Sequence, residues 1–481
     1  MKHILITTAM LVISSSALAD AADHETAAQA GDAQAQYDLA LCYAKGDGVK
    51  ASPGKAAQWY AKAAEQGHAQ AQCAFGLCLV NGTGVKPNAK KAVEWFKQAA
   101  EQDDADAQFY LGWCYDEGVG TTANPRQAAA WYRKSAQQGH AAAQHNLGWC
   151  YHFGAGVKQD YVEAVAWFRK SAEQGHSMGQ HRLAWRYEHG LGVEKDLVKA
   201  FEWYSKAAAQ EHVLSIYAMG LFYDHGRGVD KDPAQAFQWY QKAADMGHVD
   251  AQHNLAWCYE HGKGVKQDHA MAFRWYKKIA DEGATLGMLR LGMCYEDGIG
   301  VDKDPAKALA LYEKAARLGD ASAENWLGVC YRQGTVVEKN DVQAVKWFRK
   351  SAEHGDEKGQ YNLGWHYEFG EGIEKDLPKA VAWYRKSAQQ GSAMAQNAVG
   401  NCYSQGIGVD KDDAQAAAWW RKAAEQGHVE SQYWLGVSLA EGRGGLAQDL
   451  TEAGAWYKKA ADQGHVRARE RLAELQSNKQ E

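Results

Sequence analysis

The chain has 481 residues, with 49 Gly, 6 Pro, 19 Trp and a formal net charge of −6. Its length exceeds what one ordinary core serves, and its aromatic content excludes a disordered chain, so several domains or a repeat array are expected. The mild negative charge argues against nucleic acid as a partner, because phosphate binding needs a dense basic surface.

The first residues predict a cleavable signal peptide at 1–19. Lys2 supplies the positive start, Ile4 to Ile13 form the apolar segment, and Ala19 completes a small-residue cleavage site before Asp20. The apolar segment is too short to span a bilayer, as are all later ones. An uncleaved membrane anchor is the alternative. The sequence therefore predicts a periplasmic or secreted protein with no membrane insertion after signal cleavage.

A period of 36 residues governs the rest of the chain. Glycine recurs at this spacing from Gly31 to Gly427, Asp103 and Glu211 replace it twice, and Gly464 arrives one residue late. Such a period is typical of a helical solenoid. We predict an all-α fold in which residues 32–464 form twelve helix-turn-helix repeats. Residues 20–31 are expected to form an N-terminal cap and residues 465–481 a C-terminal capping helix and tail.

The second helix of each repeat carries a pattern of small and aromatic residues. In one repeat Ala128 is followed at three and four residues by Trp131 and Tyr132. The Ala recurs in all twelve repeats and the Trp in eleven, with Leu311 as the exception. These spacings place the side chains on one helical face. We therefore predict that the tryptophans, Trp275 among them, belong to the core.

A capping residue is predicted before each second helix. Ser, Asn and Asp side chains accept hydrogen bonds from the free amides of a first helical turn. Residues of these types share one phase of the repeat, namely Ser52, Asn88, Asn124, Asp160, Asp196, Asp232, Asp268, Asp304, Asn340, Asp376, Asp412 and Asp449. Acidic runs such as residues 229–232 are therefore interpreted as caps and not as calcium loops.

The first helix of each repeat carries a Leu-Gly pair with Tyr four residues after the Leu, as in Leu147, Gly148 and Tyr151. A Gly-x-Gly-Val turn follows, as in Gly154 to Val157. Glycine permits the backbone conformation that ends a helix and turns the chain. No strand precedes the motif, so it is interpreted as a connector and not as a phosphate loop.

The combined pattern, A-x-x-x-L-G-x-x-Y-x-x-G-x-G-V followed by K-A-x-x-W-Y-x-K-A-A, resembles the Sel1-like repeat, a relative of the tetratricopeptide repeat. The resemblance covers nearly all of the chain after the predicted signal. It implies a right-handed α-solenoid whose first helices line a concave face. It also implies an adaptor that assembles protein complexes, with signalling, envelope or host-contact roles in exported bacterial members. Some cysteine-rich relatives are described as β-lactamases or penicillin binders.

Eight of the nine cysteines share one phase of the first helix, and Cys73 does not. Stacked helices lie about 8–10 Å apart, whereas a disulfide needs Cα atoms within about 7 Å, so bridges between neighbouring repeats are disfavoured. The eight are predicted to fill space in the core. Cys73 has a phase expected to face the groove, so it is predicted to be the reactive thiol.

The remaining first-helix phases are predicted to form a partner-binding groove. By analogy with tetratricopeptide proteins, the positions two before and two after the Leu, and the two after the Tyr, face the concavity. The stripe fades at Leu289, Met293, Asn325 and Val329. The candidate binding residues are Phe109, Trp113, His145, Trp149, Phe153, His181, Trp185, His189, Tyr217, His225, His253, Trp257, His261, Tyr361, Trp365 and Phe369.

Aromatic anchors with nearby carboxylates are typical of peptide recognition. The alternative is that these rings only pack against neighbouring first helices. A metal site formed by His189, His225 and His261 is disfavoured, because neighbouring repeats are spaced too widely for one zinc ion.

The sequence predicts no catalytic, cofactor or metal residues. The only Ser-x-x-Lys begins at the predicted cap Ser52, and the other β-lactamase motifs are absent, as are metalloprotease and P-loop motifs. We expect an exported, monomeric, non-enzymatic scaffold that binds protein or peptide through its groove, with a role in envelope signalling, assembly or host contact. The alternative is a cell-wall or β-lactam-related hydrolase or binder of the cysteine-rich Sel1-like type.

Overall fold

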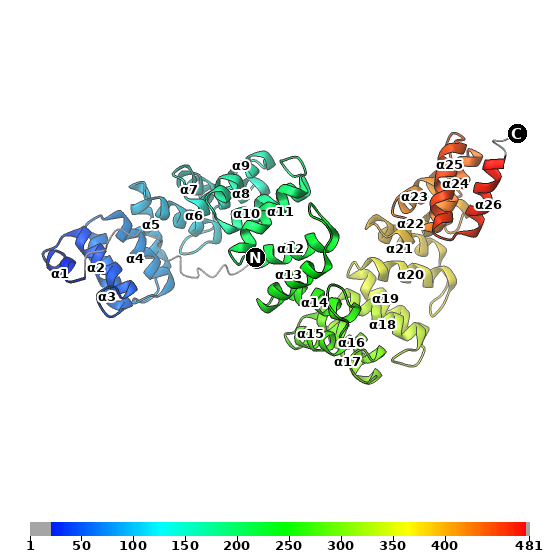
Figure 1. Cartoon of the computed structure of the whole chain (residues 1–481), viewed down its shortest axis with the longest axis horizontal. Coiled ribbons are helices and arrows are strands. Elements are labelled where there is room, and N and C mark those ends of the chain that lie inside the picture. Colours follow the sequence, from blue (N-terminus) through cyan, green and yellow to red (C-terminus); the bar gives the residue numbers. More distant parts are fainter. Residues whose placement is uncertain (1–20, 478–481) are drawn as a thin grey trace. The chain divides into compact units, whose positions relative to one another are not determined.

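The structure is a computed structural model that describes residues 21–477. The chain divides into two compact units, one that ends at Ala243 and one that begins at Ala244, and each is described by itself. The predicted signal peptide and its cleavage site lie outside the described residues. Within residues 21–477 the regular elements are all α-helices, and successive helices pack against each other in each unit (Figure 1).

The first unit contains α1 (Ala21–Gln29), α2 (Ala33–Lys45), α3 (Pro53–Glu65), α4 (Ala69–Asn81), α5 (Ala89–Glu101), α6 (Ala105–Glu117), α7 (Pro125–Gln137), α8 (Ala141–Phe153), α9 (Tyr161–Glu173), α10 (Ser177–His189), α11 (Leu197–Ala209), α12 (Val213–His225) and most of α13 (Pro233–Asp245).

The second unit contains α14 (Val249–His261), α15 (His269–Asp281), α16 (Thr285–Asp297), α17 (Pro305–Arg317), α18 (Ala321–Gln333), α19 (Asp341–Glu353), α20 (Glu357–Phe369), α21 (Leu377–Gln389), α22 (Ala393–Gln405), α23 (Asp413–Glu425), α24 (Val429–Glu441), α25 (Leu450–Asp462) and α26 (Val466–Ser477).

The predicted all-α repeat solenoid is confirmed, and the sequence signals explain the helix ends. Second helices begin at the predicted caps; for example, the Oδ1 atom of Asn88 accepts a hydrogen bond from the Lys91 amide at 3.1 Å. Ser52 is the exception, because its side chain makes no capping bond. First helices end at a glycine in the left-handed conformation, such as Gly154, whose amide donates to the Cys150 carbonyl.

Histidine caps many of the first helices, which the sequence analysis did not anticipate. The Nδ1 atom of His176, for instance, accepts a hydrogen bond from the Gly179 amide at 3.2 Å. The same bond is made by His68, His140, His212, His248, His428 and His465. An imidazole nitrogen that accepts a hydrogen bond carries no proton, so this cap requires the neutral ring.

The core aromatic residue is not the one that was predicted. Trp275 is only partly buried, whereas the next residue, Tyr276, is 1% exposed. In the other repeats, too, the tryptophan equivalent to Trp275 is partly buried and the next residue is buried, except that Trp456 is itself buried. The outer ring face is covered by a lysine three residues later, as with Lys278 at 4.9 Å from the Trp275 ring centroid. The tryptophans therefore lie at the edge of the core.

Two glycine positions explain how closely the repeats pack. A Cβ atom on Gly112 would lie 2.8 Å from the ring of Tyr132, so this glycine makes room for the core aromatic residue. A Cβ atom on Gly156, the second glycine of a connector, would lie 2.0 Å from the Pro125 carbonyl oxygen. Gly156 also has φ +72°, so it meets both a steric and a conformational requirement.

A ladder of glutamine side chains joins successive repeats. The Nε2 atom of Gln174 donates to Oε1 of Gln144 at 2.7 Å, and Gln144 in turn donates to the Ala136 carbonyl. Equivalent bonds link Gln66 to Gln36, Gln102 to Gln72, Gln138 to Gln108, Gln210 to Gln180, Gln390 to Gln360, Gln426 to Gln396 and Gln463 to Gln432.

The ladder is interrupted early in the second unit. Glu282 and Leu318 occupy the positions that hold glutamine elsewhere in the ladder. As a result, Oε1 of Gln252 is buried without a hydrogen-bond partner. Nearby, Ala284 replaces a capping side chain and leaves the start of α16 without a side-chain cap.

The two residues that replace glycine in the 36-residue pattern adopt its conformation. Asp103 has φ 62° and Glu211 has φ 60°. The left-handed region costs an ordinary residue about 1–2 kcal/mol, and less for Asp, whose short side chain forms local hydrogen bonds. The Asp103 carboxylate accepts such a bond from Gln108.

We expect Glu211→Gly to raise the free energy of unfolding by about 1 kcal/mol, because it removes this strain. Urea denaturation measures the change. Glu173→Gly is the control, since Glu173 ends the helical stretch α9 and glycine should cost about 1 kcal/mol there. Destabilisation by both substitutions would contradict the strain at Glu211.

All nine cysteines are buried, which confirms the prediction for eight of them and corrects it for Cys73. Cys73 is 5% exposed, and burial raises the pKa of its thiol well above the ordinary value. It occupies the repeat position of Phe109 and His145 and contributes a small side chain to the same buried layer. The prediction of a reactive, groove-facing thiol was wrong.

Candidate functional site

The predicted site residues fall into three levels of exposure on the first helices. Phe153, His189, His225, His261 and Phe369 are exposed. His145 and His181 are buried. The others, Phe109, Trp113, Trp149, Trp185, Tyr217, His253, Trp257, Tyr361 and Trp365, are partly buried.

His145 and His181 correct the prediction that their position faces a groove. His145 is 6% exposed, and its ring lies 5.8 Å from that of the core residue Phe168. His181 is 7% exposed and lies 5.3 Å from the ring of Tyr204. In these two repeats the side chain two before the Leu therefore packs against the second helix of its own repeat. Analogy with tetratricopeptide proteins misplaced these two side chains.

In the first unit, α8 and α10 present stacked ring pairs. Trp149 stacks on Phe153 with ring centroids 4.9 Å apart, and Trp185 stacks on His189 at 4.2 Å. The guanidinium of Arg182 lies 4.3 Å from the Trp149 ring centroid. These contacts bring predicted residues together within each helix, and Arg182 of α10 joins the two helices through Trp149. Whether they contact a partner remains a prediction.

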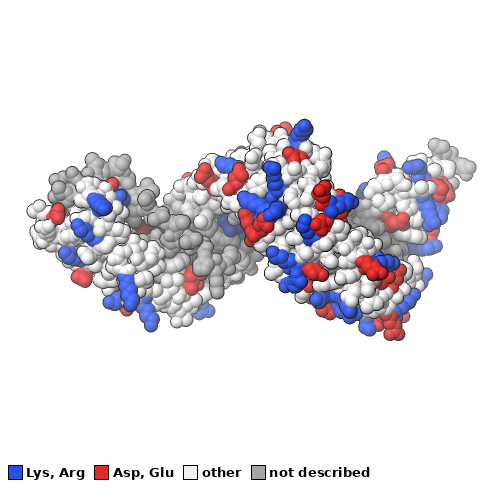
Figure 2. Space-filling view, turned by 90° about the horizontal axis from the view of Figure 1, so that it is seen from below, with Lys and Arg blue, Asp and Glu red and all other residues white. Residues whose placement is uncertain are grey.

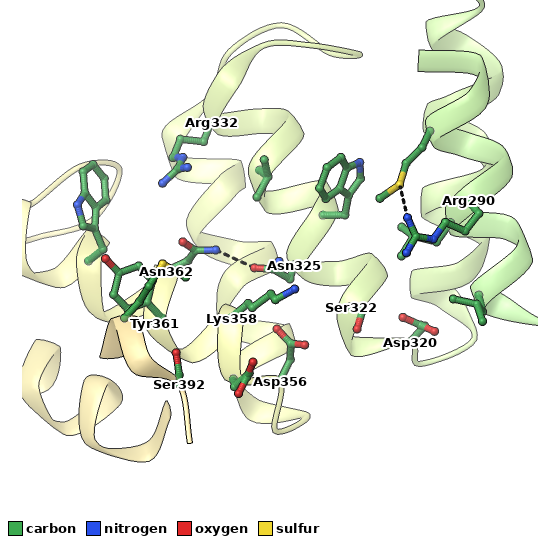
Figure 3. Close-up of a pocket in the computed structure, with 18 residues that line it drawn as sticks. Arg290, Asp320, Ser322, Asn325, Arg332, Asp356, Lys358, Tyr361, Asn362 and Ser392 are labelled. Atoms are coloured by element: carbon green, nitrogen blue, oxygen red, sulfur yellow. Dashed lines mark hydrogen bonds between the residues drawn. The ribbon is translucent and has the colours of Figure 1, made fainter. Parts of the chain in front are cut away.

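In the second unit, the first helices enclose a pocket of about 950 Å³. It is lined by residues of α16, α18 and α20 and by the start of α22, which appear as sticks in Figure 3. Leu289, Met293, Val329, Trp326 and Trp365 supply apolar surface. A volume of this size suits a short peptide segment or a similarly sized ligand. We refer to this space as the α16–α22 pocket.

Polar groups converge on the same pocket. The Nδ2 atom of Asn362 donates to Oδ1 of Asn325 at 2.8 Å, a bond drawn in Figure 3. The Nε atom of Arg290 donates to Nε2 of His253 at 3.1 Å, and burial, followed by Arg290, lowers the pKa of His253. Arg332 lies with its guanidinium 5.6 Å from the Trp365 ring centroid. The pocket thus combines apolar walls with amide and guanidinium groups.

Of the predicted site residues, Tyr361 and Trp365 line the α16–α22 pocket. The sequence analysis treated Leu289, Met293, Asn325 and Val329 as a fading of the binding stripe, yet these residues line it too. Smaller side chains leave the space that the aromatic rings fill elsewhere. The loss of aromatic residues over two successive repeats was the available signal.

The carboxylates near the aromatic stripe have a core partner that the sequence analysis did not anticipate. In six repeats an acidic residue directly follows the first-helix Tyr that lies four residues after the Leu. Its carboxylate accepts a hydrogen bond from the core tyrosine on the second helix of the same repeat. The pairs are Asp116 with Tyr132, Glu188 with Tyr204, Asp224 with Tyr240, Glu260 with Tyr276, Glu296 with Tyr312 and Glu368 with Tyr384.

Two repeats carry a basic residue type at this position, of which only Arg332 is charged, because burial and nearby arginines lower the pKa of His152. His152 and Arg332 replace the acid, and the core aromatic residues there are Phe168 and Phe348, which have no hydroxyl group. Without a phenol to donate, an acid at this position would lose its partner. The side chain at position 332 is therefore released from the core contact and lines the pocket.

Outside the pocket, charges of both signs are mixed. Figure 2 shows Lys and Arg interspersed with Asp and Glu over the described residues on the face in view. None of the helices within residues 21–477 combines the length and apolarity that crossing a membrane requires. The same residues contain no group of three or more His, Cys, Asp or Glu side chains arranged to hold a metal ion.

Comparison with known proteins agrees with the repeat pattern. The family model described as the Sel1 repeat matches residues 33–68, 69–104, 105–140, 141–176, 177–212, 213–248, 249–283, 285–320, 321–356, 358–392, 393–428 and 429–465. No curated protein matches the chain.

Solved structures include two similar bacterial proteins. A protective antigen present in uropathogenic Escherichia coli strains is 40% identical, with 88% of this chain and 90% of that chain covered and a TM-score of 0.58. A Sel1 repeat protein from Oxalobacter formigenes is 36% identical, with 51% of this chain and 96% of that chain covered and a TM-score of 0.46.

The twelve matched segments extend from residue 33 to residue 465, well over half of the chain. The fold is a repeat scaffold of a kind typical of protein-binding adaptors. The chain therefore belongs to the Sel1 repeat family.

Proposed function

We propose that this protein is an exported, non-enzymatic adaptor that binds a protein or peptide segment on its first-helix face, with the α16–α22 pocket as the main contact. The observation that carries the proposal is the pocket itself, in which apolar walls and hydrogen-bonding side chains converge. Binding sites commonly combine these features. The predicted signal peptide and the similarity to an antigen of uropathogenic Escherichia coli support an envelope or host-contact role.

The cysteines favour an adaptor over a hydrolase that uses a thiol nucleophile. All nine are buried, and burial raises the pKa of thiols such as Cys114 and Cys330 to about 12. The thiolate is the reactive form, so such groups are poor nucleophiles.

Selection from a displayed library of random seven-residue peptides tests the proposal. We expect the wild-type protein to enrich specific peptides, and Leu289→Glu to lose them because it places a charge on an apolar pocket wall. Leu318→Glu is the matched control, since Leu318 is 59% exposed at the end of α17 and lies outside the pocket.

Circular dichroism and thermal melting establish that each variant is folded before selection. Two results would refute the pocket as the binding site: no enrichment by the wild-type protein, or equal enrichment by Leu289→Glu.

A further inference from the structure

Arg332 is a cation without an acidic partner in a partly enclosed space. None of the ion pairs among the described residues includes Arg332, and its guanidinium lies 5.6 Å from the centroid of the Trp365 ring. In the equivalent position of the preceding and following repeats, Glu296 and Glu368 accept hydrogen bonds from core tyrosines. A guanidinium offers several N–H donors in a planar fork that matches a carboxylate.

Asp320, Asp356 and Glu357 are the acids that line the same pocket, and none of the three forms an ion pair with Arg332. Asp320 and Asp356 cap α18 and α20, where they accept backbone amides from Ala323 at 2.9 Å and Gly359 at 2.7 Å. Both labelled carboxylates lie along the edge of the pocket opposite to Arg332 (Figure 3). Negative charge at a helix N-terminus is already favourably placed, so these groups have little need of Arg332.

Other polar groups near Arg332 suit a peptide backbone. The bond between Asn362 and Asn325 uses the amide NH₂ of one residue and the carbonyl of the other. The Asn362 carbonyl therefore remains as an acceptor for a backbone N–H. In Figure 3 the Asn362 amide lies between Arg332 and Tyr361. Lys358, from the first turn of α20, adds a second cation that forms no ion pair with the described residues.

We infer that the α16–α22 pocket takes an extended peptide segment whose carboxylate pairs with the guanidinium of Arg332, while a neighbouring large apolar side chain of the peptide packs on Leu289, Met293 and Val329. The inference rests on the proposed function and names the chemistry of the partner. The carboxylate belongs either to an Asp or Glu side chain or to a chain terminus, since both present the same group.

The test uses two displayed libraries of random seven-residue peptides, one that ends in a free C-terminus and one embedded between Gly-Ser linkers. We expect peptides selected by the wild-type protein to carry a carboxylate next to a large apolar residue. Acid enrichment in both libraries assigns a side-chain carboxylate, and selection confined to the free-terminus library assigns the terminal one.

Arg332→Glu is the decisive variant, because it restores the acid that other repeats carry at this position. Arg317→Glu makes the same charge change at a side chain that is 69% exposed on α17 and outside the pocket. For a synthetic selected peptide, fluorescence anisotropy should show Kd rising about tenfold or more with Arg332→Glu and staying within about twofold with Arg317→Glu, as expected for loss of a charge-assisted hydrogen bond.

Replacing the peptide's Glu by Gln, or amidating its terminus, completes a double-mutant cycle. The loss of affinity should be large with the wild-type protein and small with Arg332→Glu. Selected peptides without acid enrichment, or an unchanged Kd with Arg332→Glu, would overturn the inference while leaving the proposed function intact. No selected peptides at all would instead refute the proposed function.

Discussion

Lowering the pH from 7 to 5 is expected to destabilise the segment α8–α12 by several kcal/mol. His145 and His181 are buried there beside the capping residues His176 and His212, with ring centroids 5.5 Å and 4.7 Å apart. Burial first, and the neighbouring His176 next, lowers the pKa of His145 to about 3. Burial and His212 lower the pKa of His181 to about 3.

The hydrogen bonds explain why these rings stay neutral in the folded chain. Trp149 donates to Nε2 of His145, which can accept only without a proton. Nδ1 of His212 likewise accepts the Ser215 amide, and burial lowers the pKa of His212 to about 4. The groups that face this cluster add no compensating negative charge, since Arg182 lowers the pKa of all three rings further.

The sign follows from these depressed pKa values. Above about pH 6.5 the rings are mostly neutral in both the folded and the unfolded chain, so these histidines do not reduce the free energy of unfolding. Below that pH the unfolded chain takes up protons and the folded chain does not until the pH reaches about 3–4, so stability is lost as the pH falls. The loss is about 1.4 kcal/mol per pH unit for each histidine.

Urea denaturation at pH 7, 6 and 5, followed by tryptophan fluorescence, measures this loss. The double variant His145→Phe, His181→Phe is the control, because phenylalanine is already present at this repeat position as Phe109. It should reduce the pH dependence by about 2.8 kcal/mol per pH unit. An unchanged pH dependence in the variant would show that other groups cause the acid sensitivity.

Tyr276→Ala is expected to lower the free energy of unfolding by about 3–5 kcal/mol, the range for deleting a buried aromatic ring. Tyr276 is 1% exposed, and its hydroxyl donates to Glu260 at 2.8 Å, so the substitution also leaves a carboxylate without its donor. The adjacent Trp275→Ala should cost less than about 2 kcal/mol, because that ring is only partly buried at the core edge.

Hydrogen exchange of α15 and α16, together with urea denaturation, measures both variants, since a single repeat can open without the rest of the array. The comparison is well matched because the two residues are neighbours on one helix. Equal destabilisation by the two substitutions would contradict the difference in burial on which the assignment of the core depends.

The helices and their ends could be predicted because they depend on local signals. The period of 36 residues predicts the number and spacing of the helices. Asp or Asn before a second helix and glycine after a first helix act on the backbone within a few residues, and the helices begin and end where these residues predict. Histidine as a cap was missed because Nδ1 can serve only in a neutral, well-placed ring, as at His176. That condition depends on the neighbouring repeat and is not visible in one helix.

The depth at which each side chain is buried and the position of the pocket were harder to predict. Trp275 and Tyr276 are 100° apart on the helix, so periodicity places both on the apolar side without saying which one lies deepest. His145 appeared to be a groove residue for the same reason. The α16–α22 pocket arises where small side chains such as Val329 leave space between repeats. The exchange of acid for Arg332 could have indicated it, because an acid at this position always accompanies a core tyrosine and Phe348 replaces the tyrosine here.

The interrupted glutamine ladder has a mechanical consequence. From Gln360 to Gln463 a hydrogen bond between glutamine side chains joins each repeat to the next. Sliding one repeat over its neighbour therefore breaks a hydrogen bond. Around Glu282 and Leu318 the amide-to-amide bond is missing, and the repeats are joined there by apolar packing and by the bonds from Arg290 to His253 and from Trp326 to Glu296. We therefore expect a tensile load along the second unit to be taken up first near α15–α18. The same stretch includes α16 and α18, which line the pocket, so we expect stretching of the second unit to change the width of the pocket.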